Sequence, residues 1–465
     1  MTHYDLAVIG SGSGNSIVDR RFADRRVALV EHGTFGGTCL NVGCIPTKMF
    51  VHPADLAGVT DHADRVDVDL RLEGVRWPQL RDRIFRRIDP ISEAGRRWRR
   101  DRNEHVTLVE EHARFVGLRE LETDSGERIS ADLVVIAAGS RAVVPDIPGL
   151  ESVPHHTSDT VMRLDELPRR LAIIGGGLVS AEFAHVFGSF GTEVTVVNRS
   201  NALLRSEDEE VSERFTELAR DRWDVRLGTT VDHVEPRGGG VRLHLEHDGE
   251  VTPLDVDVLL VATGRVSNAD LLDPAATGVE VDDAGRVVVD DYQRTTAEGV
   301  WALGDVSSAY QLKHVANLEA RVVQHNLLHP DDLVAADHRF VPSAVFTSPQ
   351  VASVGLTERE AAERGTRYVT SRQMYADVAY GWGMEDTTSF AKVLADPETG
   401  LILGGHIIGP HASVLIQPLV QAMSFGQTAR EVARGQYWIH PALSEVVENA
   451  LLGLDAAESS TATPG

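Results

Sequence analysis

Two glycine-rich turns that each end a short apolar strand, and a change of pattern after about residue 340, predict an α/β protein. We expect two Rossmann-like dinucleotide-binding domains, because that unit consists of a buried strand, a Gly-rich turn and a helix. The C-terminal part alternates like exposed-sheet strands around one short helix and predicts an antiparallel α+β domain. The predicted boundaries are 1–150 and 266–336 for the first nucleotide domain, 151–265 for the second, 337–455 for the α+β domain and 456–465 for a disordered tail.

The composition excludes several classes of protein. Hydrophobic residues make up 42% of the chain, which is enough for sizeable cores, and no apolar run approaches the ~20 residues of a membrane span. The first residues lead directly into a strand rather than a signal peptide, so we expect a soluble, cytoplasmic protein. The net charge of -25 argues against nucleic acid and anionic membranes as partners, since both are bound through basic patches.

The first nucleotide unit begins with the apolar strand Tyr4 to Ile9, which ends in Gly10-Ser11-Gly12-Ser13-Gly14-Asn15. We expect a helix over Ser16 to Phe22, and backbone N–H groups of the glycine turn that approach a pyrophosphate. A second strand, Val27 to Val30, ends at Glu31. A dinucleotide-binding unit places there the acid that holds a ribose hydroxyl.

The second unit begins with Leu171 to Ile174 and the turn Gly175-Gly176-Gly177, followed by a helix and the strand Glu193 to Val197. The position of the ribose acid holds Asn198 and Arg199, with Arg205 six residues further on. An acid would repel a 2′-phosphate, whereas guanidinium groups bind it bidentately, so we expect this unit to prefer NADP(H). The alternative is that these arginines are simply solvated, since arginine is abundant in this chain.

Three further strands end at residues suited to a bound nucleotide. The strand up to Ala138 closes on Gly139 and Ser140, and a later strand closes on Gly264, which lets each loop pass close to a ligand. The strand from Gly299 ends in Gly304-Asp305. An aspartate at such a turn can bind a sugar or polyol hydroxyl, although alone it would be a capping residue.

The only two cysteines are Cys39 and Cys44, spaced Cys-x4-Cys. Two sulfurs cannot fill a tetrahedral metal shell, so we expect a redox pair and no metal. Pro46 suits the first turn of a helix that starts at about Cys44, where the helix dipole stabilises a thiolate, and Lys48 then lies on the same face. A short structural disulfide and two inert thiols remain as alternatives.

Two other helices carry recognisable patterns. The arginine-rich segment Leu80 to Arg100 has Ile84, Phe85, Ile88 and Ile91 at helical spacing, which predicts one packed and one solvated face. His440-Pro441-x3-Glu445 opens an amphipathic helix with Leu443, Val446, Val447, Ala450 and Leu451 on one face, and Pro441 suits its first position. A histidine oriented by a carboxylate is an acid–base device, although His440 could also be a plain cap.

The pairing of Gly-Gly-Thr-Cys-x4-Cys-x3-Lys with a distant His-Pro-x3-Glu resembles the FAD-dependent pyridine nucleotide–disulfide oxidoreductases, the group of glutathione reductase and dihydrolipoyl dehydrogenase. The resemblance extends from Tyr4 to about Leu454. It implies that NADPH contacts Gly175, Gly177, Arg199, Arg205 and Gly264. It also implies that FAD is held by Gly10, Gly12, Gly14, Glu31, Thr38, Gly139, Ser140, Asp305, His314 and Val315.

The same resemblance implies a division of labour among the catalytic residues. Cys44 would face the flavin and Cys39 would attack a small-molecule disulfide, while Lys48 would pair with Glu182 near the flavin. His440, oriented by Glu445, would serve the active site of a second subunit, so the resemblance implies a homodimer with a C-terminal dimerisation domain.

The sequence departs from the family pattern at three positions. Asn15 and Ser180 replace the third small residue of their glycine turns, and we expect them to loosen the packing there. Leu178 stands where glutathione reductases carry an aromatic ring over the flavin.

Two rival functions can be compared with these residues. A dihydrolipoyl dehydrogenase using NAD should have an acid in place of Asn198 and Arg199, and a flavoprotein without disulfide chemistry would not need the cysteines and His440 together. A glutathione site needs cations for the substrate carboxylates, whereas Ser13 to Ile17 is short and largely polar and the chain is acidic. We therefore expect a disulfide whose non-sulfur part is mostly neutral sugar and cyclitol, although another low-molecular-weight disulfide remains an alternative.

Overall fold

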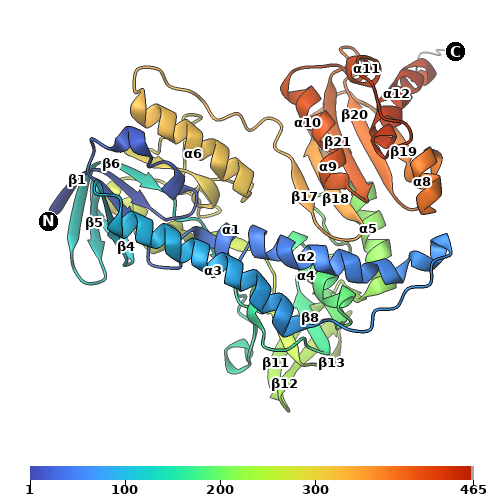
Figure 1. The fold of residues 1–465 in the computed structure, drawn as a ribbon, viewed down its shortest axis with the longest axis horizontal. Helices are drawn as coiled ribbons and strands as arrows, with labels where there is room; N and C mark the ends of the chain where they lie inside the picture. The colour runs from blue at the N-terminus through green and yellow to red at the C-terminus, as the bar shows by residue number, and fades with distance from the viewer. Residues whose placement is uncertain (462–465) are drawn as a thin grey trace.

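The computed structural model describes residues 1–461 and contains three main sheets (Figure 1). The first has the order β3-β2-β1-β6-β5-β4, with β16 beside β6. Its parallel strands meet with their carboxyl ends at one edge, which is where an α/β sheet binds ligands. The strands are β1 (Thr2–Ile9), β2 (Val27–Val30), β3 (Val106–Val109), β4 (Ala113–Gly117), β5 (Glu120–Thr123), β6 (Arg128–Ile136) and β16 (Val300–Ala302).

The second sheet is parallel with the order β10-β9-β8-β14, and a three-stranded antiparallel sheet of β11, β12 and β13 lies beside it (Figure 1). A short antiparallel pair, β7 with β15, lies where the chain passes between the first and second units. The strands are β7 (Ser140–Ala142), β8 (Arg170–Ile174), β9 (Glu193–Asn198), β10 (Asp224–Leu227), β11 (Thr230–Arg237), β12 (Gly240–His247), β13 (Glu250–Val256), β14 (Val258–Val261) and β15 (Arg265–Ser267).

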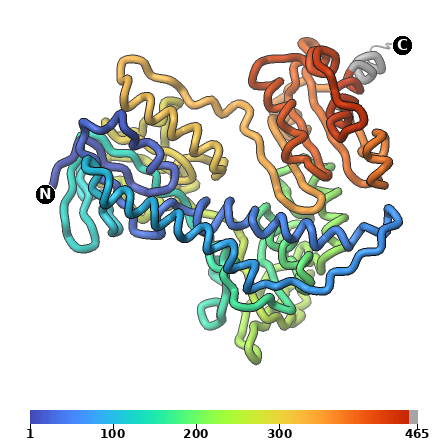
Figure 2. The backbone as a smooth tube through the Cα atoms, viewed as in Figure 1, coloured from blue at the N-terminus to red at the C-terminus, as the bar shows by residue number. Residues whose placement is uncertain are grey.

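The third sheet is antiparallel with the order β17-β18-β21-β20-β19, as the pattern after residue 340 predicts. Its strands are β17 (Ser343–Val345), β18 (Gln350–Gly355), β19 (Val369–Met374), β20 (Phe390–Ala395) and β21 (Ile402–Gly409). Helix α12 (Ser444–Thr461) packs on this sheet through the predicted apolar face: Val446, Val447, Ala450 and Leu451 are buried, and so is Leu443, which lies just before the helix. A long connection after α6 (Lys313–Leu328) leads from the first sheet to this one (Figure 2).

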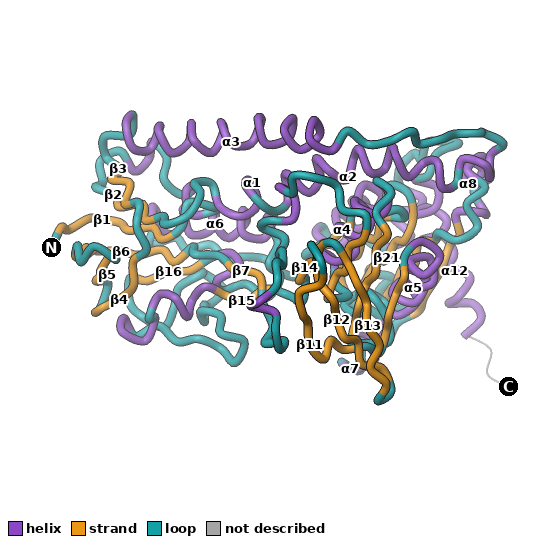
Figure 3. The backbone as a smooth tube through the Cα atoms, turned by 90° about the horizontal axis from the view of Figure 1, so that it is seen from below, coloured by secondary structure: helices purple, strands orange, loops and turns teal. Residues whose placement is uncertain are grey.

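Helix α2 (Cys44–Gly58) packs on α3 (Trp77–Asp101) and α4 (Leu178–Ser189), and α3 runs along one side of the molecule (Figure 3). Phe50 of α2 stacks on Trp77 of α3 with 5.1 Å between ring centroids. The predicted packed face of α3 is buried except at Ile91, which is 52% exposed. In that turn the buried side chain is Ser92, whose hydroxyl donates to the carbonyl of Phe35 at 2.5 Å.

The remaining helices are α1 (Gly37–Asn41), α5 (Glu209–Arg222), α7 (Glu358–Glu363), α8 (Ala379–Met384), α9 (Ala412–Leu415), α10 (Gln417–Ser424) and α11 (Ala429–Arg434). Within residues 1–461, none of the helices is both long and apolar enough to cross a membrane.

The prediction of a helix after the first glycine turn is wrong. Only two 3₁₀ turns form there, Gly14–Ser16 and Arg20–Phe22. Arg99 of α3 donates to the carbonyls of Asn15 and Val18 at 2.7 Å each, and Gln324 of α6 donates to the carbonyl of Ile17 at 2.6 Å. Side chains from two distant helices thus take backbone acceptors that a local helix would have used.

Two predictions about the C-terminus also need correction. Pro441 is not the first residue of a helix, because α12 starts only at Ser444, after a turn in which Glu445 accepts from the N–H of Ala442 at 3.2 Å. The segment predicted as a disordered tail is helical up to Thr461, in line with the high helix propensity of the alanines and the glutamate at residues 456–458. Residues 462–465 lie outside the described part of the chain.

Candidate active site

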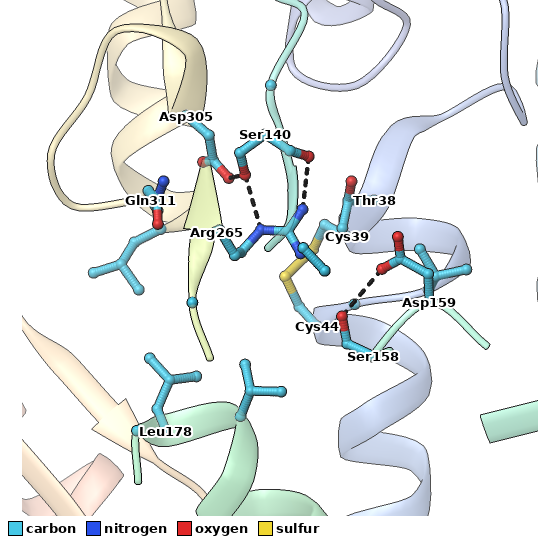
Figure 4. Close-up of a pocket in the computed structure, with 18 of the residues that line it drawn as sticks. Thr38, Cys39, Cys44, Ser140, Ser158, Asp159, Leu178, Arg265, Asp305 and Gln311 are labelled. Carbon is cyan, nitrogen blue, oxygen red and sulfur yellow. Dashed lines mark hydrogen bonds between the residues drawn. A yellow bond between two sulfur atoms is a disulfide. The ribbon is translucent and has the colours of Figure 1, made fainter. Parts of the chain in front are cut away.

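One cleft of about 1910 Å³ is lined by both glycine turns and by the disulfide. Figure 4 shows the part of it around the disulfide. Four of the predicted site residues lie outside its lining: Gly14 and Val315, which are buried in packing contacts, and His440 and Glu445. The others line it together: Gly10, Gly12, Glu31, Thr38, Cys39, Cys44, Lys48, Gly139, Ser140, Gly175, Gly177, Glu182, Arg199, Arg205, Gly264, Asp305 and His314.

The two cysteines form a disulfide, with 4.7 Å between their Cα atoms. Cys39 lies in α1, and Cys44 is the first residue of the 15-residue helix α2, as predicted. The hydroxyl of Thr47 donates to the carbonyl of Gly43 at 2.7 Å and fixes the turn between the two helices. Because Cys44 lies at the positive end of the α2 dipole, this end of the dithiol is the better place for a thiolate.

Lys48 pairs with Glu182 as predicted, with its Nζ 2.6 Å from both carboxylate oxygens. Glu182 is 4% exposed and also accepts from the N–H of Phe346 at 3.0 Å. The Lys48 ammonium lies 4.5 Å from the centre of the Phe346 ring, a cation–π contact. A carboxylate from the second unit and a ring from the C-terminal domain therefore hold this cation one helical turn from Cys44.

The two glycine turns have the same construction. Gly10 has φ +108°, and a Cβ built on it would lie 2.3 Å from the carbonyl oxygen of Ala137; Gly175 has φ +130°, and its Cβ would lie 2.2 Å from that of Ala262. Only glycine permits both the conformation and the approach. By contrast, a Cβ on Gly177 would meet no atom within 4 Å, which leaves this backbone open to a ligand in the cleft.

Glu31 lies at the end of β2 and binds the first turn. Its carboxylate accepts from the N–H of Ser11 at 2.9 Å, from the Ser11 hydroxyl at 2.6 Å and from the N–H of Gly33 at 2.7 Å. Sequence reasoning gave Ser11 no role, although a hydroxyl between two glycines of the turn was a visible signal. These three hydrogen bonds therefore fix the Glu31 carboxylate in position without a bound ribose.

Asp305 accepts a hydrogen bond from the Ser140 hydroxyl at 2.7 Å, so two predicted residues meet (Figure 4). Arg265, which sequence reasoning gave no role, donates to the hydroxyl of Ser140 at 2.8 Å and to its carbonyl at 2.7 Å. Its position directly after Gly264 was the available signal. Nearby, Lys313 donates to the Ser13 hydroxyl at 2.7 Å, and burial lowers the pKa of that lysine.

The edge of the second unit carries two exposed cations, Arg199 and Arg205, in the loop between β9 and α5. Asn198 is only 9% exposed and donates to the carbonyls of Ser200 and Ala202 at 3.3 and 3.0 Å, so it shapes this loop. Arg205 donates to the Ser200 hydroxyl at 3.1 Å. In the segment where a ribose-binding acid was considered, Asn198 therefore shapes the loop, and Arg199 and Arg205 place two cations at the cleft.

His440 and Glu445 form the predicted pair, with 2.7 Å between Nδ1 and Oε1. The hydrogen bond from His440 lowers the pKa of the Glu445 carboxyl. The imidazole is 71% exposed, and neither residue lines the cleft of its own chain. The His440–Glu445 pair is thus formed within one chain, but it does not lie at the cleft that contains the disulfide of that chain.

The expected loosening at Asn15 and Ser180 is wrong. Ser180 is 1% exposed and donates to the carbonyl of Gly175 at 2.7 Å, and the amide oxygen of Asn15 accepts from Arg99 at 2.6 Å. Both polar side chains tie the turns instead of loosening them. Leu178, the first residue of α4, lines the cleft and is 46% exposed.

The cleft suits FAD and a pyridine nucleotide. Besides Gly177, the Cβ positions of Gly139 and Gly264 have no atom within 4 Å, so three strand-end turns present open backbone to the cleft. In residues 1–461 no cluster of His, Cys, Asp and Glu side chains could hold a metal ion.

Comparison with known proteins agrees with this geometry. The family model described as pyridine nucleotide-disulphide oxidoreductase matches residues 4–320, and the dimerisation domain of that family matches residues 341–451. A mycothione reductase of Mycobacterium tuberculosis is 54% identical over 98% of this chain and 100% of its own length. A dihydrolipoyl dehydrogenase of Mycobacterium leprae is 32% identical over 98% of each chain.

Among solved structures, the HOCl-induced flavoprotein disulfide reductase RclA from Escherichia coli superposes with a TM-score of 0.84 at 29% identity, covering 97% of this chain and 99% of that one. The chain belongs to the pyridine nucleotide-disulphide oxidoreductase family and is an FAD-dependent disulfide oxidoreductase.

Proposed function

We propose that this enzyme reduces mycothione to mycothiol with NADPH and so keeps a cytoplasmic thiol pool reduced. The observation that carries the proposal is the 54% identity to a mycothione reductase over nearly the whole chain, against 32% for a dihydrolipoyl dehydrogenase of the same coverage. The segments Lys313 to Asn317 and Gln436 to His440 are among those that resemble mycothione reductases. A cytoplasmic place fits a redox pair that must be reduced in every cycle.

The residues of the first unit would hold FAD, which supplies electron transfer between the nicotinamide and the disulfide when it is bound. Glu31, fixed by Ser11, would meet the ribose, and the backbone at Gly10 and Gly12 the pyrophosphate. Asp305 would accept hydrogen bonds from polyol hydroxyls, while Ser140 holds Asp305 and Arg265 holds Ser140. Gly14 and Val315 would support this site through packing. The remaining predicted contacts are Thr38, Gly139 and His314.

The two thiols have different tasks in the proposal. The thiolate of Cys39 attacks one sulfur of the substrate, forms a mixed disulfide and releases the first thiol, whose proton comes from the partner subunit's His440. The Cys44 thiolate then attacks the Cys39 sulfur, restores the Cys39–Cys44 disulfide and releases the second thiol. Glu445 keeps the imidazole oriented for the proton transfer. Lys48, held by Glu182, places a positive charge beside Cys44 that favours its thiolate.

A homodimer is part of the proposal, because His440 lies outside the cleft of its own chain. Its neighbours along the chain include two exposed apolar side chains: Ile439 is 75% exposed and Tyr437 fully so. An apolar surface of this kind indicates an interface. A second copy seated there would cover these side chains and bring its own His440 to the disulfide.

The substrate is tested with a panel of disulfides under NADPH. We expect kcat/KM for mycothione at least about a hundredfold above that for oxidised glutathione, a discrimination of roughly 2.7 kcal/mol. A site matched to hydroxyl groups rejects a substrate that lacks them, and the acidic chain disfavours the glutathione carboxylates. Lipoamide with NADH should be poorer still. If oxidised glutathione or lipoamide is the best substrate, the choice of mycothione is wrong.

The nucleotide preference is tested at the two exposed cations. Arg199→Ala and Arg205→Ala should each weaken NADPH binding by about 1.5–3 kcal/mol, the value of a hydrogen bond to a charged group, and leave NADH binding unchanged. Arg226→Ala is the matched control, since Arg226 is an exposed arginine of β10 that does not line the cleft. Steady-state kinetics with both nucleotides gives the answer. Equal kcat/KM for NADPH and NADH in the wild type contradicts a phosphate site.

A further inference from the structure

Lys392 is one of only three lysines in the chain and lies in β20, where its side chain is 3% exposed. Its Nζ lies 2.9 Å from Asp208, 3.0 Å from Glu210 and 3.1 Å from Glu358. A buried ammonium is tolerated only with close partners of opposite charge. Glu210 belongs to α5 of the second nucleotide unit and Asp208 is the cap of that helix, so the lysine joins the C-terminal domain to that unit.

Asp208 is the partner that connects this cluster to the cleft. It is 1% exposed, caps α5 by accepting from the N–H of Glu210 at 3.2 Å, and accepts from the N–H of Glu358 at 3.4 Å. It stands three residues after Arg205. Burial acts most strongly and raises the pKa of Asp208, but the hydrogen bond and charge of Lys392 together with the other favourable contacts outweigh it and the pKa is lowered, so both partners are charged at neutral pH.

The arginine loop, residues 199–207, is held both by its own unit and by the C-terminal domain. Within its unit, Leu203 donates its N–H to the Thr216 hydroxyl at 2.9 Å and accepts from the Ser212 hydroxyl at 2.6 Å. Leu204, with φ +51°, donates its N–H to the carbonyl of Gly176 at 2.8 Å, which ties the loop to the second glycine turn. Arg359 of α7 donates to the carbonyl of Arg205 at 3.4 Å and lies 3.6 Å from Glu209. The C-terminal domain therefore contacts the loop through Arg359 at Arg205, and contacts the residue just after the loop through Lys392 at Asp208.

Charge adds a second effect. Glu207 ends the arginine loop and Asp208, Glu209 and Glu210 follow it directly, and carboxylates so close would repel a phosphate. Lys392 lies against two of them and offsets their field. Removing the lysine would leave Asp208 buried and unpaired, and the start of α5 would have to move or take up water. Both changes act on a bound 2′-phosphate more than on the rest of the nucleotide.

We propose that Lys392, assisted by Arg359, is a positioning residue for recognition of the 2′-phosphate of NADPH, although neither side chain lines the cleft. The inference rests on the proposed preference for NADPH. It makes the C-terminal domain a determinant of nucleotide choice as well as an interface between subunits.

Calorimetry on the full-length holoenzyme tests this with 2′,5′-ADP, which carries the 2′-phosphate, and 5′-AMP, which lacks it. We expect Lys392→Met to weaken 2′,5′-ADP binding about tenfold and to leave 5′-AMP binding unchanged, a tenfold change being about 1.4 kcal/mol. Steady-state kinetics should show a raised KM for NADPH with kcat unchanged. Lys392→Arg should restore most of the affinity, because it returns the charge.

Two further variants make the result decisive. Arg367→Met is the matched control: it removes an exposed cation, paired with Glu398, from the same domain and should change nothing. Because the Arg359 side chain is exposed, Arg359→Ala should fold even if Lys392→Met does not. It should weaken 2′,5′-ADP binding about threefold, the effect of losing a weak hydrogen bond, and leave 5′-AMP binding unchanged.

The outcomes separate the two proposals. If the wild type prefers 2′,5′-ADP over 5′-AMP and the folded variants keep that full preference, the positioning role alone is overturned. A wild type that binds both ligands equally overturns the NADPH preference and the positioning role with it. An equal loss of both ligands in Lys392→Met also contradicts the proposal, because it shows a general structural effect.

Discussion

Replacing either cysteine by serine should lower kcat/KM for disulfide reduction by at least about 10³-fold, the scale of effect seen when a covalent nucleophile is removed. The reason is that Cys39 and Cys44 are the only cysteines in the chain, and one thiol alone cannot re-form the disulfide after each turnover. Oxidation of NADPH by an artificial electron acceptor serves as the control. It should persist in both variants, because the nucleotide sites remain intact.

The two variants should differ in what they trap. With mycothione, the reduced Cys44→Ser enzyme should accumulate a mixed disulfide on Cys39, since the thiol that would displace it is missing. Cys39→Ser should accumulate none. Intact-mass spectrometry under non-reducing conditions detects the added mycothiol. A mixed disulfide on Cys44 in the Cys39→Ser enzyme would reverse the assignment of the two sulfurs.

His440→Ala should slow mycothione turnover by roughly 10²–10⁴-fold, the usual contribution of a positioned acid–base group. Each departing thiolate then lacks its proton donor, while NADPH oxidation by an artificial acceptor should stay fast. Glu445→Gln should have a smaller effect, because the amide still accepts a hydrogen bond from the imidazole but no longer carries the charge that stabilises imidazolium. If both activities fall together in His440→Ala, the histidine is structural.

The parts predicted correctly from the sequence depend on local pattern. The helix beginning at Cys44 follows from Pro46, and the apolar face of α12 follows from its spacing; both are in the structure. Glu31 lies at the end of its strand, because a buried strand and its turn specify that position within a few residues. The contact between Lys48 and Glu182, which are 134 residues apart, was implied by family resemblance and not by local spacing.

The parts that failed depend on side chains from distant segments. No local pattern shows that Arg99 will take the carbonyls of Asn15 and Val18 and replace a helix there. In the same way, Arg265 meets Ser140 from 125 residues away, and Lys392 meets Asp208 from 184 away. These contacts exist only after the sheets have packed. Spacing along the chain therefore cannot show them, although a lone lysine in an apolar strand was a signal worth following.

The central claim is that the disulfide of one chain works with the His440–Glu445 pair of another. Mixed dimers of Cys39→Ser and His440→Ala subunits test it most directly, because each mixed dimer would contain one site with an intact Cys39 and the partner subunit's His440. After two nearly inactive homodimers are unfolded together, refolded with FAD and paired at random, mycothione reduction should return to about a quarter of the wild-type rate, since half of the dimers are mixed and each has one good site. Recovery no greater than the sum of the two parent variants would contradict a shared site.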